Sequence, residues 1–251
     1  MRPQTPTVRV ILLVLLFVLP AHAWPPFSAT ELGELQRGKV LSEGGHEKRV
    51  VWGRMAGVVK APPSVVWELF IDSDAWPRYG IPRLLDSRLV SRELAAAMKT
   101  EKKVDDFYAS LGTQQVPLKG QRRAGGKWTH FAFQHYDVPW PVKNRWMIVD
   151  TQDNETASGE GRYLAALRLA GGNLKMMEGE FRLSRFEGDP RRTLLEYSVR
   201  TDPGAHVPRF LVKWGVKKIM PAVIEAIRRQ AKKKYPAPRA PVQKHPSSSG
   251  N

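Results

Sequence analysis

The sequence predicts an α+β fold in which an antiparallel sheet wraps around one long C-terminal helix. Three observations lead to this. A series of strand-like segments fills the middle of the chain, and the turns between them are too short for the crossovers that parallel strands need. One long amphipathic helix follows. The 251 residues are 42% hydrophobic and 25% charged, which is the composition of a globular domain. A twisted sheet around one helix leaves a cavity, and we expect that cavity to bind a small molecule.

The first part of the chain predicts a capped helix, a valine-rich strand and a helix pair. Ser28 to Glu31 reads as a helix cap. Gly53 and Gly57 share one strand face, where glycines indicate a bend or a close neighbour. The predicted elements are a helix at 31–37, a strand at 39–42, a turn at Gly44-Gly45, a strand at 49–61, helices at 65–71 and 72–79, and a strand at 84–92.

The second part predicts the sheet and the final helix. Residues 93–111 have helical spacing and read either as a helix or as a helix followed by a strand. Residues 112–126 read as a loop. Strands are expected at 127–137, 143–151, 161–170, 175–186 and 193–200, and a helix at 207–233. That helix should kink at Pro221 and bury one stripe, made of Val212, Val216, Ile219, Val223 and Ile227.

The two ends of the chain read differently from its centre. Arg2 and Arg9 precede an apolar run at 10–19, and Ala21-His22-Ala23 resembles a cleavage site. That run is too short to span a membrane, which takes about 20 residues. We expect a signal peptide at 1–23 and export, to the periplasm in a bacterium; an uncleaved N-terminal anchor is the alternative. Residues 236–251 predict a disordered tail, which leaves 24–235 as one domain.

The charge and the cysteine content limit the classes of binding partner and of chemical site that are expected. The chain has 40 Lys+Arg against 24 Asp+Glu, a formal net charge of +16, so we expect an anionic partner. Export argues against nucleic acid and favours an anionic membrane surface or an anionic small molecule. Cysteine is absent, which excludes disulfides, thiolate metal sites and cysteine nucleophiles.

Several short motifs resemble the StAR-related lipid-transfer (START) family. Residues 138–145, VPWPVKNR, resemble its PWP…NR run, and TDPG at 201–204, followed by Val207-Pro208 and Leu211-Val212, resembles the entry to its last helix. Trp67-Glu68-Leu69 with Asp72 and Trp76 is similar to its first helix pair. Leu35 and Gly38-Lys39-Val40 resemble the start of exported bacterial members. The resemblance covers residues 35–229 and implies the helix-grip fold, a cavity between sheet and helix, and no cofactor.

The chain departs from the family pattern at two places. Trp146 stands where many members have Asp after the Asn-Arg pair. The basic loop at 119–127 has a length and charge that the family pattern does not explain.

Catalytic and metal-binding patterns are not found. The histidines form no metal-binding spacing, and no G-x-S-x-G nucleophile motif occurs. His130 and His135 should point to opposite faces of one strand, each as a packed or surface residue. We therefore expect no metal ion and name no catalytic residue. Because some helix-grip proteins are cyclases that need few dedicated residues, a polyketide cyclase/dehydrase-like enzyme stays open.

The candidate ligand contacts come from strand alternation and the final helix. Arg145 is expected to reach the cavity and hold a polar head group; its alternative partners are Glu196, Glu180 and Asp150. Apolar contact is expected from Phe133, Met147, Tyr197 and Trp214, although such faces can equally be core. Membrane contact is a further expectation for the basic end of the helix, Lys213, Lys217, Lys218, Arg228, Arg229 and Lys232 to Lys234.

The sequence therefore predicts an exported monomer that binds a lipid or another hydrophobic small molecule and carries it between membranes. Besides the enzyme, a third interpretation is an envelope protein whose cavity is filled by its own side chains.

Overall fold

A computed structural model describes residues 26–99, 103–111, 122–140, 143–204 and 207–236. The residues predicted as a signal peptide, 1–23, and most of those predicted as a tail, 236–251, lie outside these ranges. Eight strands form one antiparallel sheet in the order β1-β2-β8-β7-β6-β5-β4-β3. The strands are β1 (Leu41–Glu47), β2 (Val50–Val59), β3 (Leu84–Val90), β4 (Lys127–Tyr136), β5 (Arg145–Asn154), β6 (Tyr163–Gly172), β7 (Met176–Phe186) and β8 (Asp189–Asp202).

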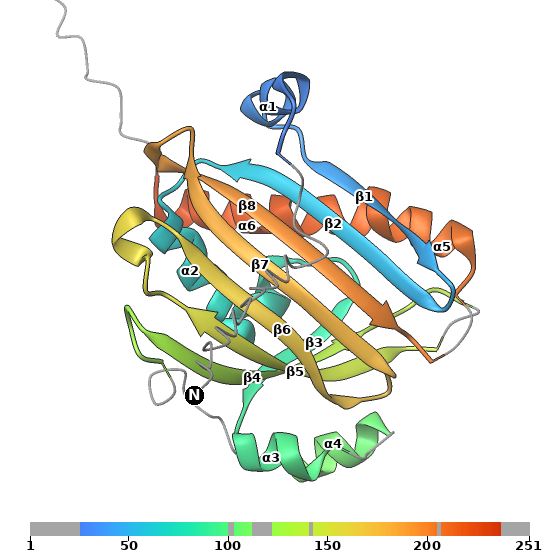
Figure 1. Cartoon of the computed structure of the whole chain (residues 1–251). Coiled ribbons are helices and arrows are strands. Elements are labelled where there is room, and N and C mark those ends of the chain that lie inside the picture. Colours follow the sequence, from blue (N-terminus) through green and yellow to red (C-terminus); the bar gives the residue numbers. More distant parts are fainter. Residues whose placement is uncertain (1–25, 100–102, 112–121, 141–142, 205–206, 237–251) are drawn as a thin grey trace, which may run out of the picture.

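The helices lie on both faces of this sheet. Figure 1 looks onto the outward face, with α2, α5 and α6 behind the sheet and α3 and α4 along its lower edge. Among the described residues, no helix is long and apolar enough to cross a membrane. The helices are α1 (Ala29–Gln36), α2 (Pro63–Ile71), α3 (Arg92–Ala97), α4 (Val104–Leu111), α5 (Arg209–Trp214) and α6 (Met220–Lys234), with 3₁₀ turns at Ser73–Tyr79 (η1) and Ser158–Glu160 (η3) and a π turn at Gly215–Ile219 (η4).

Glycines in β1 and β2 let the C-terminal helix approach the sheet closely. A Cβ atom on Gly53 would lie 2.8 Å from Met220 Sδ, and one on Gly57 would lie 2.9 Å from Ile224 Cδ1. Both glycines were expected to mark a bend or a close neighbour, and the close neighbour is α6. The turn predicted at Gly44-Gly45 is wrong, because β1 continues through both residues to Glu47. A Cβ on Gly44 would meet Val216 Cγ2 at 2.5 Å, so this glycine too makes room for the helix.

The final helix is interrupted, as Pro221 predicts. Proline lacks the N–H for the bond to residue i−4, and its ring clashes with that carbonyl. The chain accommodates it with the π turn at Gly215–Ile219, directly before α6. The turn divides the predicted stripe in two. Val216 lies against β1, and Met220 and Ile224 lie against β2, whereas Ile219, Val223 and Ile227 face the interior cavity.

The described part of residues 93–111 forms two helices, α3 and α4, whose apolar side chains pack on the outward face of β4 and β5. Phe107 of α4 stacks on Phe133 of β4, with ring centroids 3.8 Å apart, and Trp146 and Ile148 of β5 complete this second core. Both faces of the sheet are therefore apolar here. Phe133, which is fully buried, lies in this outer core and not in the cavity.

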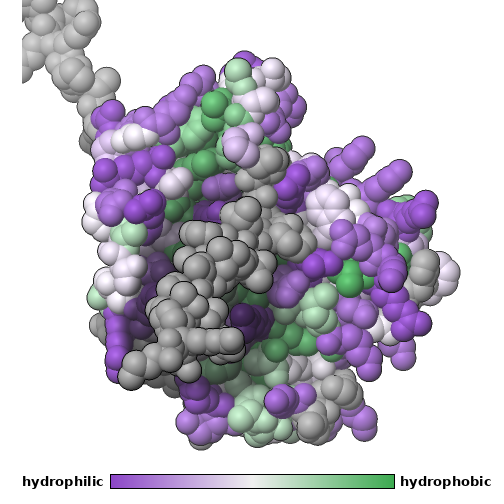
Figure 2. Space-filling view, viewed as in Figure 1, coloured by the Kyte–Doolittle hydropathy of each residue, from purple (hydrophilic) through white to green (hydrophobic). Residues whose placement is uncertain are grey.

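Elsewhere the outward face is charged. Arg54 of β2 pairs with Glu43 of the neighbouring β1, and Arg200 of β8 reaches across β2 to pair with Glu47 of β1. Figure 2 shows hydrophilic side chains over this part of the molecule, towards β1, β2 and α5, with apolar ones nearer α1 and α3. The concave face, turned towards α6, is consequently the face that can enclose an apolar ligand.

Candidate functional site

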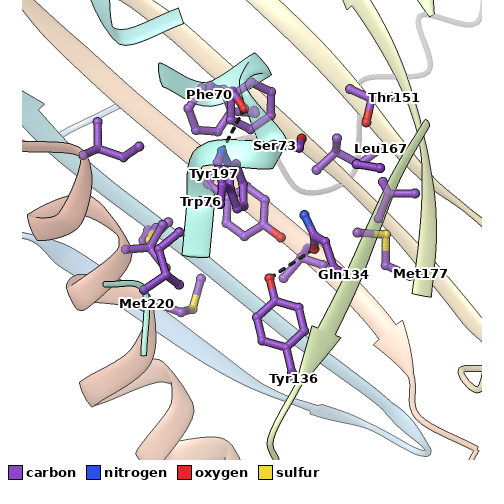
Figure 3. A pocket seen from close by; sticks show the side chains of 18 of the residues that line it. Phe70, Ser73, Trp76, Gln134, Tyr136, Thr151, Leu167, Met177, Tyr197 and Met220 are labelled. Atoms are coloured by element: carbon purple, nitrogen blue, oxygen red, sulfur yellow. Dashed lines mark hydrogen bonds between the residues drawn. The ribbon is translucent and has the colours of Figure 1, made fainter. Parts of the chain in front are cut away.

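The site is an interior space between the concave face of the sheet and the α5–α6 segment, in two adjoining compartments. The inner cavity has a volume of about 240 Å³ and is the more enclosed. The vestibule has a volume of about 340 Å³ and is more open. Seven residues line both compartments, so they share one wall: Gln134, Tyr136, Met177, Tyr197, Val199, Ile219 and Met220. Figure 3 shows the inner cavity and how these side chains converge on it.

The walls of the inner cavity are apolar and held in place. Phe70 of α2 stacks on Phe181 of β7 with centroids 3.7 Å apart. Trp76 of η1 donates its indole N–H to the carbonyls of Leu69, at 3.2 Å, and Phe70, at 3.1 Å. Leu167, Val149 and other aliphatic side chains line the rest. Such a lining provides affinity for hydrocarbon, and a few polar groups set its orientation.

Two tyrosines stand where the compartments meet. Tyr136 donates its hydroxyl to Gln134 Oε1 at 3.1 Å. Tyr197 faces it from β8, as Figure 3 shows. Burial raises the pKa of Tyr197 to about 12 and also raises the pKa of Tyr136. Both phenols are therefore uncharged at neutral pH and add hydrogen-bonding capacity to the wall without adding charge.

Arg145 is a half-buried cation in the vestibule. Its Nη1 donates to the carbonyls of Lys143, at 2.8 Å, and Asn144, at 3.4 Å, and its Nε is buried without a partner. Burial lowers the pKa of Arg145. Among the described residues it makes no ion pair. A half-buried guanidinium that lacks a carboxylate is the natural counterpart of an anionic group.

The acids named as alternative partners of Arg145 do not reach it. Glu196 lies on the outward face of β8, opposite Arg182 of β7. Glu180 pairs with that same Arg182, and Asp150 lies on the outward face of β5 near Arg92 and Arg168. Arg145 and Glu196 thus project from opposite faces of the sheet, so the alternative prediction of a structural ion pair between them is wrong.

Of the other predicted contacts, three line the site and one does not. Met147 and Trp214 line the vestibule, and Tyr197 lines both compartments. Phe133 is a correction: alternation along β4 sends His130, Ala132, Gln134 and Tyr136 into the cavity and turns Phe133 outward onto α4. Whether the three cavity residues touch ligand stays a prediction.

Sequence reasoning missed the polar residues of the inner cavity. His130 is 2% exposed, and its Nδ1 lies 2.6 Å from Oδ2 of the buried Asp153. Thr151 lies directly opposite His130 in the β4–β5 register. The expected separation of His130 from His135 is confirmed, since His135 contacts Tyr108 on the outer side. A polar residue at an inward position of an apolar strand was the available signal. No group of three or more metal-ligating side chains occurs in the described part of the chain.

Part of the basic loop at 119–127 has a structural role. Arg122 binds both carboxylate oxygens of the buried Glu155, at 3.0 and 3.1 Å, and reaches Glu68 at 2.5 Å. Glu155 also accepts from Trp67 at 2.8 Å and Trp128 at 3.1 Å. This network fixes the end of the cavity that lies furthest along β4 and β5 from the vestibule. Residues 119–121 lie outside the described ranges.

Some basic residues at the end of the helix hold the fold together, and others are exposed to solvent. Arg228 donates to the carbonyls of Val58 at 2.9 Å and Gly38 at 2.8 Å, and Arg229 donates to that of Tyr79 at 3.2 Å. These two arginines tie α6 to the rest of the fold. Arg229 is nevertheless exposed, as are the lysines at 213, 217, 218 and 232–234.

Exposed aromatic residues flank the vestibule. Trp140 is 88% exposed and follows Pro139, which lines the vestibule. Phe210 of α5 is 62% exposed and precedes Trp214, another lining residue, by one helical turn. Lys143 and Arg209 are exposed beside them. We call Trp140, Phe210, Lys143 and Arg209 the vestibule rim.

No family model matches the chain, and no curated protein matches its sequence. Solved structures do match. The STAR-related lipid transfer protein from Xanthomonas axonopodis has 14% identity and a TM-score of 0.52, covering 77% of this chain and 93% of that one. Two further matches score lower. The Zhui aromatase/cyclase from Streptomyces sp. R1128 has 15% identity and a TM-score of 0.49, covering 75% of this chain and 97% of that one. Human STARD10 has 10% identity and a TM-score of 0.47, covering 86% of this chain and 84% of that one.

One fold accounts for the order and pairing of the strands and for the helix across their concave face. The match to the Xanthomonas axonopodis structure indicates the same fold. The chain has the START-like helix-grip fold.

Proposed function

We propose that the protein binds an anionic amphipathic lipid, with the hydrocarbon in the inner cavity and the head group at Arg145 in the vestibule. One observation carries the proposal: an enclosed apolar cavity opens onto a vestibule that holds a guanidinium without a carboxylate partner among the described residues. Apolar walls favour the hydrocarbon at about 25 cal/mol per Å² of buried surface. The anion would complete the hydrogen bonding of Arg145, which the protein leaves unfinished.

The proposal extends to transfer between membranes. The vestibule rim combines two exposed aromatic side chains with two exposed basic residues, all close in sequence to residues that line the vestibule, and this combination favours a membrane interface with anionic lipid. The net charge of +16 supports such a partner. Export from the cytoplasm, proposed from residues 1–23, would place the protein where lipids move between membranes; N-terminal sequencing of the mature protein would test it by finding Trp24 first.

The test is native mass spectrometry of protein purified from its own cells, followed by organic extraction. Wild type should carry an anionic lipid, and Arg145→Met should carry much less while it melts at the same temperature. The matched control is Arg162→Met, which removes an exposed arginine that pairs with the exposed Glu160. Wild type without any lipid, or Arg145→Met with an unchanged load, would contradict the proposal.

A second candidate, an enzyme of the same fold, is favoured by the buried His130–Asp153 pair at the cavity wall. Such a pair can act as a general acid–base group. If it does, extracted ligand should be chemically altered after incubation with wild type and unaltered with His130→Gln. Ligand recovered unchanged from wild type would contradict catalysis.

A further inference from the structure

The inward faces of β4 and β5 form a ladder of side chains that runs the length of the site. Cross-strand pairs follow one another from Tyr136 and Arg145 at the vestibule, through Gln134 with Met147 and Ala132 with Val149, to His130 with Thr151. The two ends of the ladder are polar and its middle is mainly apolar. Arg145 and Thr151 lie six residues apart, a rise of about 20 Å along an extended strand.

His130 is held so that one ring nitrogen serves the protein and the other faces the cavity. Nδ1 lies 2.6 Å from Asp153 Oδ2, while no hydrogen bond joins Nε2 to any residue in the described part of the chain. Trp128 stacks on the imidazole with centroids 5.1 Å apart, and Glu155 fixes that indole. His130 lines the inner cavity. Its Nε2 is therefore a positioned polar atom in a largely apolar space.

Nε2 can bond an oxygen of a ligand in either tautomer of the ring. When Nδ1 carries the hydrogen and donates to Asp153, Nε2 accepts a hydrogen bond from a hydroxyl group. When Nε2 carries the hydrogen, it donates to the oxygen of that group. The Thr151 hydroxyl lies opposite it and both donates and accepts. A hydroxyl group on the ligand therefore satisfies Nε2 in both tautomers.

We propose that the inner cavity contains a second recognition site, in which His130 Nε2 and the Thr151 hydroxyl bind an uncharged hydroxyl group at the far end of the ligand. The inference rests on the proposed function and narrows it. The ligand would be an elongated acid with an anion at Arg145 and a hydroxyl group about 20 Å deeper. A purely hydrocarbon tail would leave His130 Nε2 without a hydrogen-bond partner in an apolar space, which is unfavourable.

The test compares two probes of equal length, hexadecanoic acid and ω-hydroxyhexadecanoic acid, by calorimetric titration of delipidated wild type. An apolar pocket should bind the hydroxylated acid more weakly, because its hydroxyl loses water without replacement. The proposed site should bind it more tightly, by about tenfold. The two accounts therefore predict opposite signs, and this comparison needs no variant.

Two variants test which residues cause the preference for the hydroxylated acid. His130→Phe combined with Asp153→Leu removes both partners together, so neither is left unpaired, and it should reverse the preference. Thr151→Val keeps the pair and should reduce the preference. If wild type binds the hydroxylated acid no more tightly than hexadecanoic acid, the second recognition site is overturned. Binding of hexadecanoic acid itself would still uphold the proposed function. A preference that survives in the double variant would overturn the assignment to His130, and binding of neither acid would overturn both proposals.

Discussion

Replacing Gly57 by alanine tests whether the C-terminal helix rests on a glycine-lined strand. The new Cβ would lie 2.9 Å from Ile224 Cδ1 and 3.0 Å from its Cγ2. Ile224 is fully buried, so it has no free space to move into. Overpacking of this kind costs about 1–3 kcal/mol, and alanine regains about 0.5–1 kcal/mol over glycine in a strand. The net loss of about 1–2 kcal/mol should lower the Tm by roughly 3–6 °C in a domain of this size.

Thermal unfolding followed by circular dichroism measures this loss. Gly159→Ala is the matched control, because its Cβ would meet nothing within 4 Å and should leave the Tm unchanged or slightly higher. Adding Ile224→Val to Gly57→Ala removes one of the two clashing atoms, so the double variant should be more stable than the sum of the single changes predicts. A Tm for Gly57→Ala equal to that of wild type, or simple additivity with Ile224→Val, would refute this packing.

Three further predictions concern other parts of the molecule. Burial opposes ionisation of Glu155, but hydrogen bonds from Arg122 and neighbouring donors hold its pKa below the usual 4.5. Ionised Glu155 therefore stabilises the folded state fully above pH 4.5, and this stabilisation is lost as the pH falls through the lower folded-state pKa. Glu155→Gln should be less stable than wild type at neutral pH, and its stability, measured by denaturant titration, should depend less on pH in the acid range. Phe133→Ala should cost about 3–5 kcal/mol in urea unfolding, yet the folded fraction should keep its lipid load, since a lost load would return Phe133 to the cavity. Trp140→Ser with Phe210→Ser should weaken sedimentation with anionic vesicles at an unchanged Tm, and unchanged sedimentation would remove the vestibule rim from the proposal.

The sequence predicted the elements more reliably than the faces they present. Strand alternation identified β4 as a strand, but both of its faces are apolar, because α3 and α4 cover the outward one. Alternation alone cannot separate a cavity wall from an outer core, and Phe133 was placed in the wrong one. Met147, on β5, was placed on the cavity side because its neighbours Arg145 and Val149 share that face.

Roles that depend on distant contacts could not be derived from the sequence. Arg228 looks like one charge on a basic helix face, yet it is bound by carbonyls of Gly38 and Val58, far away in the chain. His130 shows no spacing to any partner that would mark it as functional. Its role follows from the register that sets it beside Asp153, and register emerges only when the strands pair.

The most direct measurement of the central claim is photo-crosslinking with a fatty acid that carries a diazirine at the methyl end of its chain, followed by peptide mapping. If the hydrocarbon occupies the inner cavity and its carboxylate lies at Arg145, crosslinks should fall on inner-cavity residues such as Phe70, Leu167 and Phe181, and they should decrease in Arg145→Met. Crosslinks confined to the outer core around Phe107, or spread over the surface and unchanged in Arg145→Met, would contradict it.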